Sequence, residues 1–172
     1  MIHSMSDTMS GIDEDLGKAE MLLAQEEFDK ARKKFADIIK ANPGCAPAYF
    51  GKAEASMGVQ KVTAEEIMEL YKKAYELEPD NVYYLTTLGS FCADIGRFNE
   101  AEQYYNKATE IDEENSSLYF SEFAIAYFTK APIIMEKFLD ENTKGMIKKK
   151  TLSYLLKALD MSPEEAKKLL GS

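Results

Sequence analysis

The sequence predicts an all-α protein built from successive pairs of helices, and two observations lead to this fold class. First, three segments share a skeleton of about 34 residues: an amphipathic helix, a short turn, a second helix with alanine and aromatic residues at fixed spacing, and an acidic turn. Second, the tetrapeptide Gly-Lys-Ala-Glu at 17–20 recurs at 51–54, a shift of 34 residues. A period of this length is typical of helical arrays, in which each unit buries its apolar face by stacking on its neighbours.

The first and third units show the skeleton most plainly. The first is predicted to be a helix over 13–25 and a helix over 28–41, whose apolar residues recur at i, i+3, i+7 and i+10 and therefore share one face. Asn-Pro-Gly at 42–44 ends this helix, because proline cannot continue it. The third unit is predicted to be helical over 81–95 and 98–111.

The second unit is predicted to be helical over 46–58 and 63–77, with a longer turn between its helices. Thr63 lies at the start of the second helix, and Glu66 follows three residues later. This spacing predicts a capping box, in which each side chain accepts a hydrogen bond from the backbone N–H of the other residue.

The two ends of the chain depart from the repeat. Residues 1–11 are expected to form a flexible tail. A strongly aromatic helix is expected over 116–129, followed by a short, irregular helix over 131–139 and a helix over 145–160. Ser-Pro-Glu-Glu at 162–165 has the composition of a helix N-terminus and predicts one more short helix. Such modified end units commonly cover the exposed core of an array.

Composition excludes several classes of function. With 172 residues, of which 45% are hydrophobic, the chain can bury a substantial core. Its net charge of −9 argues against binding to nucleic acid or to an anionic membrane. The charge is uneven: residues 131–172 hold 8 Lys against 6 Asp or Glu, a net of +2, which leaves −11 for residues 1–130. The repeat body is therefore acidic.

Catalytic and metal-binding patterns are missing from the sequence. The single histidine is His3, and the two cysteines, Cys45 and Cys92, are too far apart to suggest a metal site or a disulfide framework. No run approaches the roughly 18 apolar residues of a membrane span. We therefore expect a cytoplasmic protein that is not an enzyme and that uses no cofactor and no metal.

The three units agree at a set of equivalent positions. In the third unit these are Leu85, Leu88, Gly89, Gly96, Phe98, Ala101, Tyr105 and Ala108. In the first two units they are Ala19, Phe28, Ala31, Phe35, Pro43, Tyr49, Ala53, Tyr71, Ala74 and Pro79. These positions resemble the signature of the tetratricopeptide repeat (TPR) family over residues 12–130. The departures are Lys18 in the position before Ala19, Ile67 where the family usually has alanine, and Glu113 where it has proline.

The resemblance implies a domain organisation and a binding surface. The units would cover 12–45, 46–81 and 82–115, with a degenerate fourth from 116 and a C-terminal helical cap over 131–172. The family's right-handed superhelix lines a concave groove with the first helix of each pair. Projected onto this chain, the groove residues are Leu16, Glu20, Leu23, Phe50, Glu54, Met57, Tyr83, Thr86, Ser90, Asp94, Phe120 and Tyr127.

The expected function is that of a non-catalytic adaptor or scaffold, whose partner is another protein. A peptide or helix with apolar and basic residues would bind in the groove, with Glu20, Glu54 and Asp94 selecting the basic residues. The alternative is self-assembly into a homo-oligomer through the aromatic fourth helix and the C-terminal helices, motivated by the apolar density over 118–128. A further alternative is that residues 141–172 fold back and occupy the groove.

Overall fold

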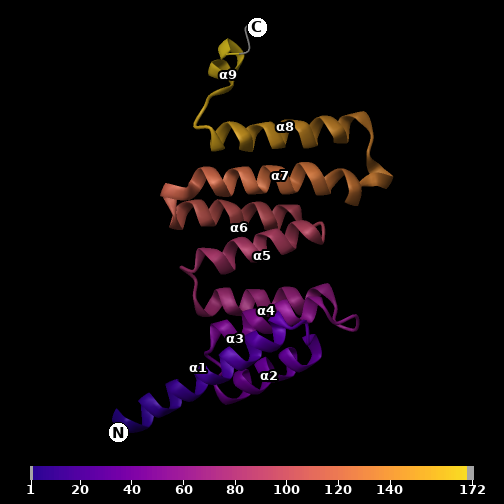
Figure 1. Cartoon of the computed structure of the whole chain (residues 1–172). Coiled ribbons are helices and arrows are strands. Elements are labelled where there is room, and N and C mark those ends of the chain that lie inside the picture. Colours follow the sequence, from indigo (N-terminus) through magenta and orange to yellow (C-terminus); the bar gives the residue numbers. More distant parts are fainter. Residues whose placement is uncertain (1, 170–172) are drawn as a thin grey trace. The chain divides into compact units, whose positions relative to one another are not determined.

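The computed structural model describes residues 2–169, and for residues 2–10 the backbone only. This part of the chain forms α-helices and two short 3₁₀ helices, without a β-strand, which confirms the all-α class (Figure 1). The chain divides into two compact units, one ending at Tyr84 and the other beginning at Leu85. The helices are α1 (Ile2–Ala24), α2 (Phe28–Ala41), α3 (Ala46–Met57), α4 (Ala64–Leu77), α5 (Val82–Asp94), α6 (Phe98–Ile111), α7 (Ser116–Ile134), α8 (Glu141–Ala158) and α9 (Pro163–Leu169). The 3₁₀ helices are Glu113–Asn115 and Glu136–Phe138.

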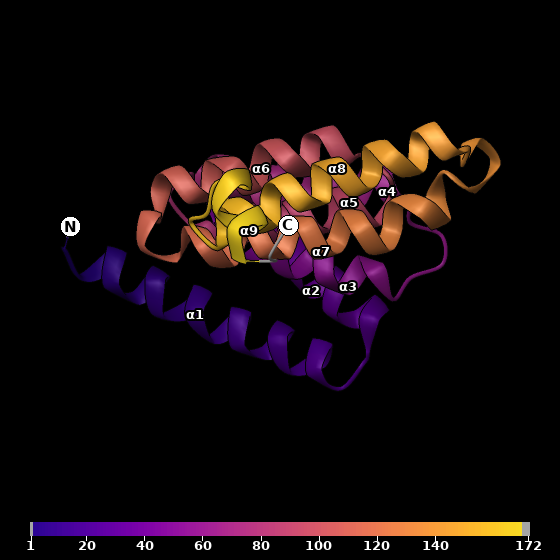
Figure 2. The ribbon, with the colours of Figure 1, turned by 90° about the horizontal axis from the view of Figure 1, so that it is seen from above.

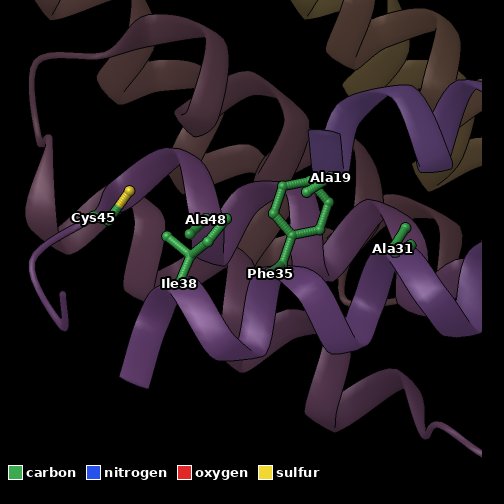
Figure 3. Close-up of a cluster of buried hydrophobic side chains, with 7 residues drawn as sticks. Ala19, Ala31, Phe35, Ile38, Cys45 and Ala48 are labelled. Carbon is green, nitrogen blue, oxygen red and sulfur yellow. The ribbon is translucent and has the colours of Figure 1, made fainter. Parts of the chain in front are cut away.

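The core of the first unit lies between α1, α2 and α3. Helix α2 buries Ala31, Phe35 and Ile38, which follow one another at helical spacing on a single face. Ala19 of α1 and Ala48 of α3 face them across the core (Figure 3). Because these alanines are small, the three helices can approach closely around the Phe35 ring.

Gly51 of α3 also belongs to this close packing. A Cβ atom at this position would lie 2.3 Å from Cζ of Phe35, far inside ordinary contact distance. The equivalent Gly17 of the repeated tetrapeptide has nothing within 4 Å of such an atom. The same residue type is therefore required by packing in one repeat and not in the other.

The predicted capping signals are confirmed. Thr63 Oγ1 accepts a hydrogen bond from the Glu66 backbone N–H at 3.2 Å, and the Thr63 N–H donates to Glu66 Oε2 at 2.9 Å. Ser162 and Glu165 make the same reciprocal pair ahead of α9, at 3.2 and 2.8 Å. These bonds satisfy backbone donors that have no partner inside the helix.

Two predicted boundaries at the ends of the chain are wrong. A flexible tail was expected over residues 1–11, but residues 2–11 are helical and belong to α1. Helix α7 does not end near residue 129 but runs through Pro132 to Ile134. The proline lies in the last turn, so its missing N–H removes only the bond to the carbonyl of Phe128, whose side chain is exposed.

In the second unit, α8 rather than the irregular segment acts as the partner of α7. Helix α8 begins at Glu141, earlier than expected, and lies alongside α7 (Figure 2). Its Tyr154 is 4% exposed, and the Tyr154 ring centroid lies 4.6 Å from that of Phe123 on α7. The Tyr154 hydroxyl donates to Glu102 Oε1 of α6 at 2.7 Å and accepts from Asn106 Nδ2 at 3.0 Å. The fourth helix pair is therefore α7 with α8.

Candidate binding surface on the first helices

One hollow of about 460 Å³ lies in the first unit, where α1, α3 and the beginning of α5 come together; we call it the first hollow. It contains five of the residues predicted from the sequence to line a groove: Glu20, Leu23, Phe50, Glu54 and Tyr83. The remaining lining residues are Phe35, Pro47, Gly51, Asn81 and Tyr84. The 34-residue repeat explains part of this convergence, because Glu20 and Glu54 end the two copies of the Gly-Lys-Ala-Glu tetrapeptide.

The aromatic wall of the first hollow is centred on Phe50. Its ring stacks on Tyr84 with centroids 4.7 Å apart, is tilted by 45° against Tyr83 at 5.3 Å, and meets Tyr71 edge-on at 5.5 Å. Tyr84 and Tyr71 are buried, whereas Tyr83 is 65% exposed. The buried rings hold Phe50 in place, and the Tyr83 ring is open to solvent.

The acidic wall is formed by Glu20, which is exposed, and Glu54, which is half-buried. The Tyr71 hydroxyl donates a hydrogen bond to Oε1 of Glu54 and lies 3.4 Å from the sulfur of Met57. Burial, and then the bond to Glu54, raises the pKa of Tyr71 well above its usual value, so the phenol stays protonated and keeps donating. Among the described residues that line this hollow, none is Lys or Arg.

A second hollow, of about 440 Å³, lies within the second unit between α5 and α7. It contains Thr86 and Ser90 of the predicted set, together with Glu122 and Lys130 of α7, which the prediction missed. Burial raises the pKa of Glu122 and lowers the pKa of Lys130. The other lining residues are Thr87, Tyr105, Ile125, Ala126 and Thr129.

Asp94 was expected to select basic residues of a ligand, but its carboxylate already has a partner. Lys130 of α7 forms an ion pair with Asp94 within the second unit. The carboxylate charge is thus already countered by a side chain of the protein itself. The sequence could not reveal this pair, because the two residues are 36 positions apart in helices whose relative rotation depends on packing.

Phe120 and Tyr127 were also predicted to line the groove, and the structure places them elsewhere. The Phe120 ring lies 5.9 Å from Tyr154 of α8, and the Tyr127 ring meets Phe98 of α6 edge-on at 5.2 Å. Both therefore belong to the face of α7 that α6 and α8 cover. The opposite face of α7, with Glu122 and Ile125, lines the second hollow.

Three remaining predictions concern Leu16, Met57 and the C-terminal helices. Leu16 packs against the core of the first unit, and Met57 is exposed beside the Tyr71 hydroxyl. Helix α8, considered as an occupant of the groove, contributes no residue to the second hollow, because its Ile147 and Tyr154 are buried. Within the second unit, α8 is thus a packing helix.

Other chemistry finds little support in the described residues. Among the side chains that the structure describes, those of residues 11–169, there is no group of three or more His, Cys, Asp or Glu placed to hold a metal ion. Cys45, which lies in a turn and could have been reactive, is buried in the core of the first unit, and Cys92 is fully buried. No helix in this range is both long and apolar enough to cross a membrane.

Family comparison agrees with the architecture. One model of the tetratricopeptide repeat matches residues 16–82, and a second tetratricopeptide repeat model matches residues 82–115. Together they cover more than half of the chain, and the matched segments contain the C-terminal part of α1 and the helices α2 to α6. The chain therefore belongs to the tetratricopeptide repeat family, whose arrays are protein-interaction modules.

Similar curated proteins share this region. Protein CTR9 homolog of Arabidopsis thaliana is 27% identical over 58% of this chain and 9% of its own length. Small glutamine-rich tetratricopeptide repeat-containing protein 2 of Mycosarcoma maydis is 29% identical over 62% of this chain and 32% of its own length. Anaphase-promoting complex subunit 3 of Schizosaccharomyces pombe is 23% identical over 83% and 19%. The chain thus spans a third or less of the length of these relatives.

Solved structures show the same fold at low identity. Two structures of MamA superpose with a TM-score of 0.66 over 96% of this chain, at 14% and 16% identity, and over 86% and 79% of their own chains. A MamA RS-1 ArsTM double mutant has a TM-score of 0.55 over 60% of this chain and 57% of its own, at 22% identity. At these identities the likeness concerns the fold alone.

Proposed function

We propose that this protein is a non-catalytic adaptor or scaffold that binds a peptide or helix of another protein through the surface around the first hollow. One observation carries the proposal: two carboxylates and a cluster of aromatic rings converge on a single hollow whose lining includes no cation. An apolar wall with acidic groups at its edge suits a partner segment that carries both apolar and basic residues.

The aromatic residues would supply most of the binding free energy. Tyr83 and Phe50 combine large apolar area with few rotatable bonds, which is typical of residues that dominate protein interfaces. The Phe50 ring is held against Tyr84 and Tyr71 before any ligand arrives. Little side-chain entropy would therefore be lost on binding.

The carboxylates would supply specificity. Glu54 is oriented by the Tyr71 hydroxyl, and Glu20 lies exposed among the lining residues of the same hollow. With a net charge of −9, the chain would repel an acidic partner and accelerate the approach of a basic one. The relative named as a subunit of the anaphase-promoting complex is consistent with a role in an assembly of proteins. We propose a cytoplasmic location, with which the two free, buried cysteines are consistent.

The test is affinity capture from a native cell extract, read by mass spectrometry. The wild type is compared with a Glu54→Lys/Tyr83→Ala variant, which reverses one charge and removes one ring in the hollow. Asp37→Lys/Phe138→Ala is the matched control, because both of its residues are exposed and neither lines the hollow. Circular dichroism establishes that all three chains are folded.

A protein that binds the wild type and the control, and not the hollow variant, supports the proposal. Loss of the Tyr83 ring alone should weaken its binding by about 1–3 kcal/mol. Equal capture by all three chains would show that the partner uses another surface.

Self-assembly is a second candidate, and one observation favours it. Helix α8 carries five Lys and one Glu; its Leu152 is 56% exposed, and Leu159, the residue that follows the end of the helix, is 66% exposed. Exposed leucines at a basic helix could bind the acidic repeat body of a second copy. Sedimentation equilibrium of the wild type and a Leu152→Glu/Leu159→Glu variant tests this. A wild type that stays monomeric at high concentration excludes it.

A further inference from the structure

We infer that the first hollow is a receptor for one arginine side chain of the partner, with the guanidinium group stacked on the Phe50–Tyr83 wall and hydrogen-bonded to Glu54. The inference rests on the proposed function and adds to it the identity of the side chain that enters the hollow. It is carried by the size of the hollow, the orientation of its rings and the placement of its two carboxylates.

The hollow has room for one long side chain. Its volume of about 460 Å³ is near the lower end of the range of about 300–1,000 Å³ that small-ligand pockets occupy. A whole helix is too wide for it, since a helix with its side chains is about 10–12 Å across. The partner therefore lies over the opening and places one long side chain inside.

The rings form a corner that a flat cation can enter. Phe50 is backed by Tyr84 on a nearly parallel plane, at 22°, and Tyr83 is inclined to Phe50 by 45°. A cation over such ring faces is attracted by their negative electrostatic potential. Guanidinium is planar and weakly hydrated, so it stacks on a ring with less loss of hydration than a lysine ammonium group.

Glu54 is positioned to pair with the same group. Its Oε1 atom accepts from Tyr71, which fixes the carboxylate, and a carboxylate can accept about four hydrogen bonds in all. Glu54 therefore keeps acceptor capacity for the fork of N–H groups that arginine carries. Glu20, on the preceding first helix, adds a second negative charge to a lining in which no described residue is Lys or Arg.

The second hollow lacks a feature that arginine binding requires, which is a lining without a cation. It also contains a carboxylate, Glu122, and an aromatic ring, Tyr105. However, it includes Lys130, which already pairs with Asp94, and burial raises the pKa of Glu122. An arginine side chain would meet a cation there, so the second hollow is an internal control for the first.

The experiment is a titration of the uniformly ¹⁵N-labelled full chain with N-acetyl-L-arginine methylamide, followed by NMR chemical shifts. The citrulline derivative, which has nearly the same shape without the charge, and the lysine derivative are titrated in parallel. The arginine derivative is expected to shift the signals of Glu54, Tyr83 and their neighbours, and to leave those of Glu122 and Lys130 in place. The lysine derivative should bind about fivefold more weakly, and the citrulline derivative about tenfold.

Variants connect the shifts to the proposed contacts. Glu54→Gln keeps the shape of the side chain and should weaken binding of the arginine derivative about five- to tenfold. Tyr83→Ala should weaken it about threefold or more, since the ring is exposed. Asp37→Asn, the same loss of charge on an exposed site outside the hollow, should leave binding unchanged.

Equal binding of the arginine and citrulline derivatives, no shift in the first hollow up to the solubility limit, or indifference to Glu54→Gln would each overturn the inference. These outcomes are separate from the capture experiment. If the hollow variant no longer captures the partner but the wild type does not bind the arginine derivative, the proposed function is retained and arginine is refuted as the occupant. If the derivative binds in the hollow but all variants capture the same proteins equally, the arginine site is present and the proposed function is refuted.

Discussion

Replacing Gly51 by alanine should destabilise the protein, although the same change at Gly17 should stabilise it. Both glycines open the repeated tetrapeptide and lie inside helices. At Gly51 the new methyl group would lie 2.3, 2.4 and 2.8 Å from three atoms of the Phe35 ring. Carbon atoms prefer about 3.5–4.0 Å, so the ring would have to retreat by about 1 Å.

The Phe35 ring has little room to retreat. It is 1% exposed and packed among Ala19, Ala31 and Ile38 (Figure 3). Overpacking of this kind costs about 1–3 kcal/mol, and the severity of the overlap places Gly51→Ala at the upper end. The better helix propensity of alanine returns about 1 kcal/mol, which leaves a net loss of about 1–2 kcal/mol.

Gly17→Ala gains the helix propensity without the overlap, because nothing lies within 4 Å of the added atom. We expect a stabilisation of about 0.5–1 kcal/mol, so the two variants should differ by about 1.5–3 kcal/mol. Urea unfolding measures both, provided that the m value stays constant. Combining Gly51→Ala with Phe35→Leu should recover part of the loss, as a double-mutant cycle would show. A Gly51→Ala chain as stable as the wild type would refute the packing of α3 against Phe35.

Three further predictions concern single side chains. Thr63→Ala removes the capping box and should cost about 1 kcal/mol in urea unfolding, whereas an unchanged midpoint would contradict the cap. Thr151→Val should stabilise by about 1 kcal/mol, because the Thr151 hydroxyl is buried without a hydrogen-bond partner; a loss of stability would show that it has one. Burial, and then Glu102, raises the pKa of Tyr154 from 10.0 to about 12, so its contribution to stability is complete below about pH 10 and falls as the pH rises toward 12. Tyr154→Phe should therefore be less stable than the wild type by about 1–2 kcal/mol at neutral pH. Its absorbance titration at 295 nm should show one fewer phenol that ionises at high pH, and an unchanged titration would contradict the burial.

Half of the lining residues of the first hollow could be predicted from the repeat. Residues one period apart occupy equivalent places on equivalent helices, so the acidic ends of the two tetrapeptides, Glu20 and Glu54, were expected on the same surface. The same reasoning assigned Phe50 and Tyr83 to the groove, and both line the first hollow. It gave no information on the Tyr71 hydroxyl that orients Glu54, because Tyr71 is a core position of the repeat.

The reasoning failed where the repeat degenerates. On α7 the spacing shows that Phe120 and Tyr127 share a face, but both faces of this helix are apolar enough to be buried. Helix α8 covers the face with Phe120, and the face with Glu122 is left to line a hollow. The choice depends on Tyr154 of α8, whose hydroxyl meets α6 at Glu102, 52 residues away in the sequence.

The sequence by itself determined the helical repeat, the caps at Thr63 and Ser162, and the alignment of equivalent residues, because these depend on backbone periodicity and on groups within a few residues of one another. Only the tertiary structure decided that Asp94 is paired with Lys130, that α8 completes the fourth helix pair, and that Gly51 is required where Gly17 is not. Helical periodicity predicts which side chains share a face, whereas the rotation of each helix against its neighbours decides which residues that face contacts.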